Sequence, residues 1–178
     1  LEINDNLFTG KLPDEIGNWR SLLRFNITNN QFEDALPSTI GNWANLFYFQ
    51  VGNNQLTGSL PTTVGTWTKV IQVSLADNQF SGSLPDEIGG WKAIKTFNIT
   101  NNQFTGTVPS GVDNWTGMTN SNANVRINNN QLSGTLPAKF ITLGTAAPTR
   151  VTYCPQYTTY PYDPINLSSS PWSNYTCP

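Results

Sequence analysis

The 178-residue sequence contains no histidine and only two cysteines. Without histidine, neither a Ser-His-Asp triad nor a Cys-His pair can form. Histidine-ligated metal sites are also excluded, and two cysteines cannot build a four-thiolate zinc site. There is no glycine-rich phosphate loop of the Walker type and no basic stripe of the kind that nucleic acids bind. No apolar run approaches the about 20 residues that cross a bilayer. We therefore expect a chain that uses no cofactor, binds no nucleic acid and has no membrane span in this segment.

Charge is also scarce. Nine Lys and Arg and eleven Asp and Glu give a formal net charge of −2, and charged residues make up 11% of the chain, against about 25% in a typical soluble protein. A glycosidase with paired carboxylates is the enzyme class that remains open. However, the adjacent pairs Asp14-Glu15 and Asp86-Glu87 directly follow a proline at a predicted turn start. There they favour the positive end of a short helix, so we expect no enzymatic activity.

The chain repeats itself with a constant period. Trp occurs at the evenly spaced positions 19, 43, 67, 91 and 115. An asparagine recurs in the same register, as Asn6, Asn30, Asn54, Asn78, Asn102 and Asn130. The last interval between asparagines is longer than the others, because four extra residues lie within 116–124. Such a period indicates a solenoid, in which stacked units share one core.

Each unit predicts a short strand followed by a turn. Phe25-x-Ile27, Phe49-x-Val51 and Phe97-x-Ile99 alternate with period two, as expected for a strand with one buried face. The recurring asparagine and the glycine four residues later are expected to end the strand. The stretch from proline to tryptophan predicts a short 3₁₀ or α turn. The asparagines are expected to form a ladder that pairs backbone groups of adjacent coils, and the tryptophans to pack in the core.

These units resemble the leucine-rich repeat family. The pattern LxxLxLxxNxLxG is matched by Ile94, Phe97, Ile99, Asn102, Phe104 and Gly106. The 24-residue period and the Gly-x-Leu-Pro continuation resemble the plant-type extracellular subclass, whereas Gly-Asn-Trp resembles algal or protist variants. One unit departs from the pattern, since Asp34 replaces the repeated glycine. The resemblance implies a right-handed, curved leucine-rich-repeat solenoid with a parallel β-sheet on the concave side and short 3₁₀ or α turns on the convex side. It also implies binding rather than catalysis.

Two regions are predicted. Residues 1–143 hold six leucine-rich repeats, the first starting in mid-repeat and without an amino-terminal cap, which suggests a piece of a longer chain or an end covered by another chain. Residues 144–178 are predicted to form a carboxyl-terminal cap, in which Trp172 covers the end of the core. Cys154 and Cys177 are expected to form one disulfide. By closing the loop between them, it would stabilise the folded protein by about 3 kcal/mol. The alternative is two free thiols.

Five Asn-X-Ser/Thr sequons are present, at Asn26, Asn98, Asn114, Asn166 and Asn174. None has proline in the middle position, so all five are formal acceptors of N-linked glycans, although some matches are expected by chance in a chain rich in Asn and Thr. Together with the cysteine pair they indicate the secretory route and an extracellular location, at the cell surface or in the cell wall. Asn26 and Asn98 are expected on the outward side of their strands.

The outward strand positions define the candidate binding face. They are polar and nearly uncharged, which suits sugar hydroxyls, and Arg24 with Tyr48 is the pair most like an interface hot spot. The candidate residues are Arg24, Tyr48, Gln50, Gln72, Ser74, Thr96 and Arg126. The alternative is that these side chains are only solvated strand positions.

Three functions fit these features. The first is an extracellular recognition or adhesion module that binds a protein or glycan. The second is a fibre-forming structural glycoprotein that stacks head to tail, since heterologous contacts give open filaments. The third is an inhibitor of the polygalacturonase-inhibitor type or a small-ligand binder, including an ice-binding protein, although the outward strand columns mix residue types rather than repeating threonine.

Overall fold

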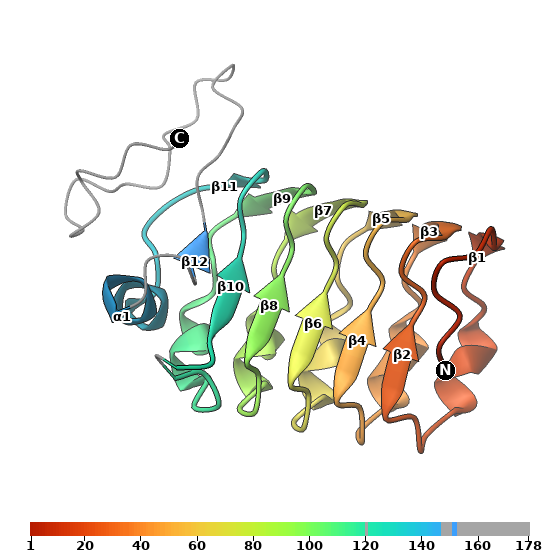
Figure 1. Cartoon of the computed structure of the whole chain (residues 1–178), viewed down its shortest axis with the longest axis horizontal. Coiled ribbons are helices and arrows are strands. Elements are labelled where there is room, and N and C mark those ends of the chain that lie inside the picture. The colour runs from red at the N-terminus through yellow and green to blue at the C-terminus, as the bar shows by residue number, and fades with distance from the viewer. Residues whose placement is uncertain (120, 147–150, 153–178) are drawn as a thin grey trace.

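The computed structural model describes residues 1–119, 121–146 and 151–152. Within them the chain winds as a solenoid, in which each coil contributes one strand to each of two sheets and one 3₁₀ helix between them (Figure 1). All strand pairs are parallel. The expected solenoid with short 3₁₀ turns opposite its sheet is therefore confirmed.

The concave sheet has the strand order β12-β10-β8-β6-β4-β2. Its members are β2 (Arg24–Asn26), β4 (Tyr48–Gln50), β6 (Gln72–Ser74), β8 (Thr96–Asn98), β10 (Asn124–Arg126) and β12 (Val151–Thr152). From β2 to β8, each residue pairs with the residue one repeat later, as Tyr48 does with Gln72. Between β8 and β10 the paired residues, such as Thr96 and Asn124, are four residues further apart in the sequence. The extra residues thus lie between β8 and β10, and the register of the sheet is kept.

A second six-stranded sheet was not predicted. Its strands are β1 (Thr9–Lys11), β3 (Gln31–Ala35), β5 (Gln55–Gly58), β7 (Gln79–Ser83), β9 (Gln103–Gly106) and β11 (Gln131–Leu132). The concave strands end before the recurring asparagine, and the chain then enters a second strand that was not foreseen. The repeated glycine belongs to this second strand at positive φ, as at Gly58 (+72°) and Gly82 (+75°). Glycine adopts this conformation without a steric penalty, and the chain bends there without leaving the sheet. Asp34 takes the same conformation (φ +65°) in its coil.

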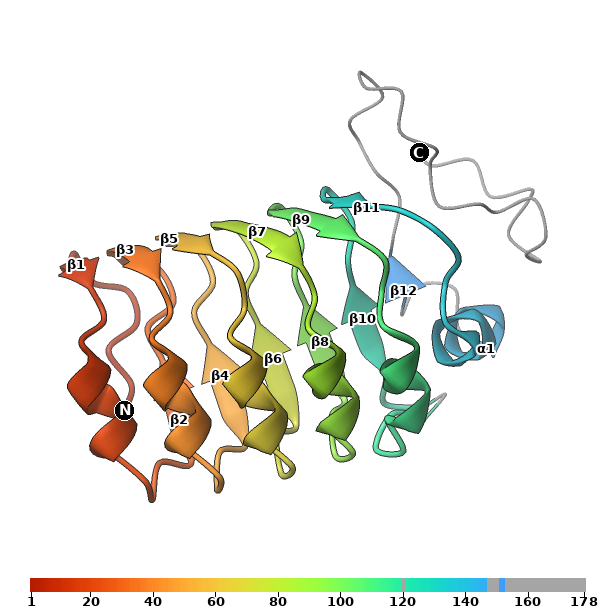
Figure 2. The same ribbon diagram turned by 180° about the vertical axis from the view of Figure 1, so that it is seen from behind.

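Short 3₁₀ helices lie opposite the concave sheet, as the view from behind shows (Figure 2). They are η1 (Asp14–Asn18), η2 (Ser38–Asn42), η3 (Thr62–Thr66), η4 (Asp86–Gly90) and η5 (Ser110–Asn114). Each follows a proline, as at Pro61 (φ −62°), and the φ that the proline ring imposes suits the residue before a helix. An α-helix, α1 (Ala138–Ala146), takes the corresponding place after β11 and spans the predicted boundary between residues 143 and 144.

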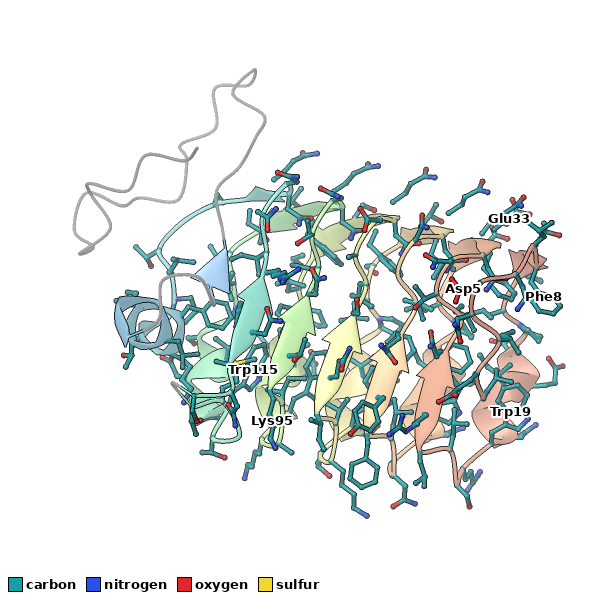
Figure 3. All side chains as sticks on the ribbon, viewed as in Figure 1. Asp5, Phe8, Trp19, Glu33, Lys95 and Trp115 are labelled. Carbon is teal, nitrogen blue, oxygen red and sulfur yellow. The ribbon has the colours of Figure 1, made fainter. Side chains whose placement is uncertain are left out.

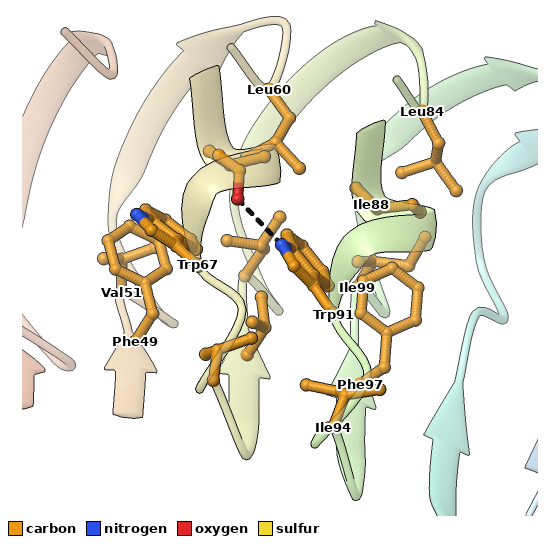
Figure 4. Close-up of a cluster of buried hydrophobic side chains, with 14 of the residues drawn as sticks. Phe49, Val51, Leu60, Trp67, Leu84, Ile88, Trp91, Ile94, Phe97 and Ile99 are labelled. Atoms are coloured by element: carbon orange, nitrogen blue, oxygen red, sulfur yellow. Dashed lines mark hydrogen bonds between the residues drawn. The ribbon is translucent and has the colours of Figure 1, made fainter. Parts of the chain in front are cut away.

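The core is a continuous stack of apolar side chains inside the coils (Figure 4). Trp67 and Trp91 stack with ring centroids 6.0 Å apart, and Trp91 and Trp115 follow at 6.2 Å. All three are fully buried, whereas Trp19 in the first coil is 44% exposed. Figure 4 also shows why tryptophan recurs, because the indole Nε1 of Trp91 donates a hydrogen bond to the Val64 carbonyl at 2.8 Å. The side chain therefore fills the coil and satisfies a buried backbone group of its neighbour.

Candidate ligand-binding face

The concave sheet places the predicted binding residues in straight columns. Strand pairing puts one outward position of each strand beside the next, in the order Arg24, Tyr48, Gln72, Thr96 and Asn124. The second column runs through Asn26, Gln50, Ser74, Asn98 and Arg126, and Glu2 forms an isolated bridge to Asn26. All seven candidate residues therefore lie on one surface, spaced by about 4.8 Å from strand to strand.

A third column, of Thr28, Gly52, Ala76, Thr100 and Asn128, lies beside the second. Gly52 and Ala76 are both buried there, and a Cβ on Gly52 would lie 3.2 Å from the Ala76 carbonyl oxygen. Their small side chains let the coils turn tightly at the ends of β4 and β6. The two polar columns are at least partly exposed along their whole length, whereas the third column is buried in its middle.

Arg24 and Tyr48 contact each other as a cation–π pair. The guanidinium carbon of Arg24 lies 4.2 Å from the centroid of the Tyr48 ring, within the range in which the ring quadrupole attracts a cation. Arg24 also approaches Glu2 at 3.8 Å, with both side chains more than half exposed. Such an exposed ion pair contributes about 0–1 kcal/mol, and an exposed cation–π contact contributes about 0.5–1 kcal/mol. The two contacts together hold the guanidinium beside the Tyr48 ring.

The rest of the face carries little charge. Arg126 is exposed, and in the described part of the chain the Arg24–Glu2 contact is the one ion pair. Between Tyr48 and Arg126 the columns present amides and hydroxyls, which both donate and accept hydrogen bonds. That chemistry suits a ligand with many hydroxyl or amide groups, and it contains no general acid–base pair.

Three of the five sequons lie in the described structure. Asn26 and Asn98 stand on the concave sheet, and each Oδ1 accepts a hydrogen bond from the backbone N–H two residues later, of Thr28 and Thr100, at 3.1 Å. Asn114 is exposed at the end of η5, on the opposite side of the coil. Asn166 and Asn174, the two cysteines Cys154 and Cys177, and Trp172 lie outside the described residues.

The recurring asparagines connect successive coils. Asn78 is typical, since its Nδ2 donates to the carbonyls of Val51 and Leu75 at 3.0 and 3.1 Å and its Oδ1 accepts from the Leu56 N–H at 3.0 Å. Equivalent bonds are made by Asn30, Asn54, Asn102 and Asn130. Asn6, in the first coil, is exposed, and its side-chain Nδ2 donates to two carbonyls of its own coil, those of Ile3 and Asn4.

A second ladder runs beside the first and was missed from the sequence. It comprises the residues of positive φ that directly precede the repeated asparagines, namely Asp5, Asn29, Asn53, Asp77, Asn101 and Asn129. Asn53 donates to Asn29, and Asn29 to Asp5. Hydrogen bonds from Asn29 and from Asn4 lower the pKa of Asp5 below its ordinary value. The signal was present in the sequence, because Asn and Asp are the residues that most readily replace glycine at positive φ.

The alternative chemical sites do not assemble. The acid pairs Asp14-Glu15 and Asp86-Glu87 are exposed in the first turns of η1 and η4. Over the described ranges no three His, Cys, Asp or Glu side chains gather where they could hold a metal ion. No helix within those ranges has the length and apolarity to cross a membrane.

Comparison with known proteins relates this architecture to one family. The sequence profile described as "Leucine Rich Repeat" matches residues 69–91 and 93–115. No curated protein sequence gave a significant match. Solved structures of plant receptor ectodomains share this fold.

One neighbour is the ectodomain of the Arabidopsis thaliana membrane receptor kinase GASSHO1/SCHENGEN3, in complex with CASPARIAN STRIP INTEGRITY FACTOR 2. It is 33% identical, with a TM-score of 0.71, over 76% of this chain and 16% of that one. Another is the Arabidopsis receptor kinase HAESA in complex with the peptide hormone IDA and the co-receptor SERK1, at 25% identity and a TM-score of 0.75, over 93% of this chain and 27% of that one. The chain thus spans only about a sixth to a quarter of these receptors' length.

Proposed function

The chain belongs to the leucine-rich repeat family, and on this premise we propose that it is a non-catalytic recognition module of an extracellular glycoprotein. It binds a protein or glycan on the concave sheet, at the cell surface or in the cell wall. The binding residues are the two polar columns that include Tyr48, Gln72 and Ser74, with Arg24 and Arg126 near the two ends.

The observation that carries this proposal is the register of the concave sheet. It aligns amide and hydroxyl side chains on one surface, with the Arg24–Tyr48 pair ordered at its edge by ring contact. Tyr and Arg are enriched where binding energy concentrates. Plant receptor ectodomains of the same fold are found in complexes with peptide hormones, which supports a ligand-binding role for this chain too.

The extracellular location and glycosylation rest on the sequons. Asn114 is exposed at the end of η5 on the convex side, where a glycan would not obstruct the concave face. Glycans on Asn26 or Asn98 would stand among the binding columns. An open concave binding face therefore requires that Asn26 and Asn98 carry no glycan, whereas a glycan on Asn114 is compatible with it. Glycopeptide mass spectrometry of the secreted protein measures the occupancy of each site.

The function is tested by screening the secreted 178-residue protein against a panel of oligosaccharides (β-glucan, xylan and galacturonan fragments) and of peptides rich in hydroxyl groups. The proposal expects saturable binding to a narrow class of these probes, without turnover of the probe. Cleavage of an oligosaccharide, or no binding to any probe, would contradict it.

The fibre-forming and enzyme-inhibitor alternatives remain predictions. Light scattering of the same sample distinguishes long filaments from separate particles. A one-to-one complex with a galacturonan-cleaving enzyme would favour an inhibitor.

A further inference from the structure

Positive charge collects along one edge of the solenoid. The turns that lead from each 3₁₀ helix into the concave strands comprise residues 19–24, 43–48, 67–72 and 91–96, here called the basic edge. They contain five of the nine basic residues and no acidic residue, the five being Arg20, Arg24, Lys69, Lys92 and Lys95. We propose that this edge docks an acidic protein segment that also carries apolar side chains.

The basic edge also exposes apolar side chains in one column. The N–H of Phe47 donates to the Leu23 carbonyl at 2.9 Å, that of Ile71 to the Phe47 carbonyl at 2.8 Å, and that of Lys95 to the Ile71 carbonyl at 2.8 Å. Leu23, Phe47, Ile71 and Lys95 are therefore direct neighbours in successive coils, and the column is about 14 Å long at the usual strand spacing. Leu23 is 53% exposed, and Phe47 and Ile71 are partly exposed.

The charges surround this column. Lys95 is the last residue of the column and lies at the lower edge of the molecule in Figure 3. Lys69 donates from Nζ to Asn45 Oδ1 at 2.7 Å, which holds its ammonium beside the preceding coil. Lys92 is exposed in the same turn as Lys95.

Within the described ranges, one acidic residue approaches the basic edge. Glu2 is the one acid that contacts a basic side chain in the described structure, Arg24. Other acids occupy the first turns of the 3₁₀ helices and the second sheet, as with Asp86 and Glu33. A chain of net charge −2 thus presents one basic surface, and such a surface selects a partner of opposite charge.

The apolar column decides the chemical class of the partner. An acidic polysaccharide matches the ammonium groups but carries no aliphatic side chains to cover Leu23 and Ile71. An anionic membrane needs apolar side chains that protrude and insert, whereas Phe47 and Ile71 are only partly exposed. A polypeptide with alternating acidic and apolar residues satisfies both features, because it covers apolar area and pairs charges along the same column of about 14 Å, about four residues of extended chain.

The test is a selection of random displayed peptides on the immobilised, full 178-residue protein, followed by measurement of Kd for selected peptides. Peptides rich in Glu or Asp together with Leu, Ile or Phe are expected. Their binding should weaken about tenfold in the Lys92→Gln/Lys95→Gln double variant, the change for losing two close charge contacts. Leu23→Ser should weaken binding as well, and added salt should reduce the affinity.

The matched control is Lys11→Gln/Lys139→Gln, which removes the same charge away from the basic edge and should leave Kd unchanged. The proposal is overturned if the selected peptides are not acidic, if the two double variants bind them equally, or if Leu23→Ser has no effect. It is also overturned if vesicles of phosphatidylserine or polygalacturonate bind the edge more tightly than the selected peptides do. None of these variants touches the polar columns between Tyr48 and Arg126, so failure here is distinguishable from failure of the proposed concave binding.

Discussion

The indole N–H of Trp91 donates a hydrogen bond to the Val64 carbonyl of the preceding coil, at 2.8 Å, inside a fully buried aromatic stack. The same bond joins Trp43 to Ile16, Trp67 to Ile40 and Trp115 to Ile88. Each tryptophan therefore connects two coils by a polar contact as well as by ring packing. This relationship explains why tryptophan, and not another large apolar residue, recurs with the period of the repeat.

Trp91→Phe should destabilise the protein. The smaller ring leaves a void and removes the indole donor from the Val64 carbonyl, which keeps the Trp67 N–H at 3.1 Å. The lost packing and the lost hydrogen bond together should cost about 1–3 kcal/mol. Denaturant unfolding followed by circular dichroism measures the change. Trp19→Phe is the control, because Trp19 is 44% exposed, and its change should stay within about 0.5 kcal/mol. Equal effects of the two substitutions would contradict this role of the indole N–H.

Asn78→Leu should be among the most damaging single substitutions. Leucine has a similar volume but leaves the Leu56 N–H without its acceptor, and such a group costs about 1–3 kcal/mol when buried. The Val51 and Leu75 carbonyls each lose one donor and keep another, from Asn54 and Asn102. We expect a loss of about 2 kcal/mol or more in the free energy of unfolding, from one unsatisfied N–H and two lost hydrogen bonds. Asn6→Leu changes the same repeat position where it is exposed, so a similar loss there would show that the bonds between coils are not the cause.

Gly41→Ala should weaken the packing of neighbouring 3₁₀ helices. A Cβ at Gly41 would lie 2.5 Å from the Thr63 Cβ and 2.8 Å from the Thr63 carbonyl oxygen. Since a backbone atom is involved, the coils must move apart, at about 1–3 kcal/mol. Thermal unfolding measures the loss, and Ser38→Ala, an exposed change in the same helix, should leave the melting temperature nearly unchanged.

Asp5 should make stability depend on pH in acid. Hydrogen bonds from Asn29 and Asn4 lower the pKa of Asp5 in the folded protein, so the folded state favours the carboxylate. Its contribution is present above the unfolded pKa of about 3.9 and is lost as pH falls through the lower folded value. Wild type should therefore exceed Asp5→Asn in unfolding free energy above that pH, with the difference shrinking in stronger acid. A difference that grows as pH falls would have the wrong sign.

Most of the fold could be predicted because its determinants repeat. Six in-register asparagines and five tryptophans set the coil length, and the alternation of Phe97 and Ile99 identified the concave strand. The second sheet could not be foreseen by the same reasoning. Its glycines look like strand breakers locally, whereas parallel neighbours on both sides supply the hydrogen bonds that keep a bent strand in a sheet.

The candidate face was predictable as a set of positions but not as a surface with contacts. Period-two alternation placed Arg24 and Tyr48 in one column, and the structure adds the ring contact between them. The apolar column of the basic edge could have been predicted from the sequence, because Leu23, Phe47 and Ile71 recur at the 24-residue period. The basic residues beside it do not recur at one position in successive repeats, so no periodic charge pattern indicated this edge. How far each of these side chains is exposed depends on its neighbours in the adjacent coils, which the local sequence does not reveal.

The decisive measurement is the affinity of the tightest-binding probe from the oligosaccharide and peptide panel for two matched double variants. Tyr48→Ala/Gln72→Ala alters the concave sheet, whereas Gln55→Ala/Gln79→Ala removes exposed side chains from the second sheet. Binding on the concave face predicts that Kd rises about tenfold or more in the first variant and changes less than about twofold in the second. Equal affinities in the two variants, or a larger loss in the second, would contradict recognition by the concave sheet.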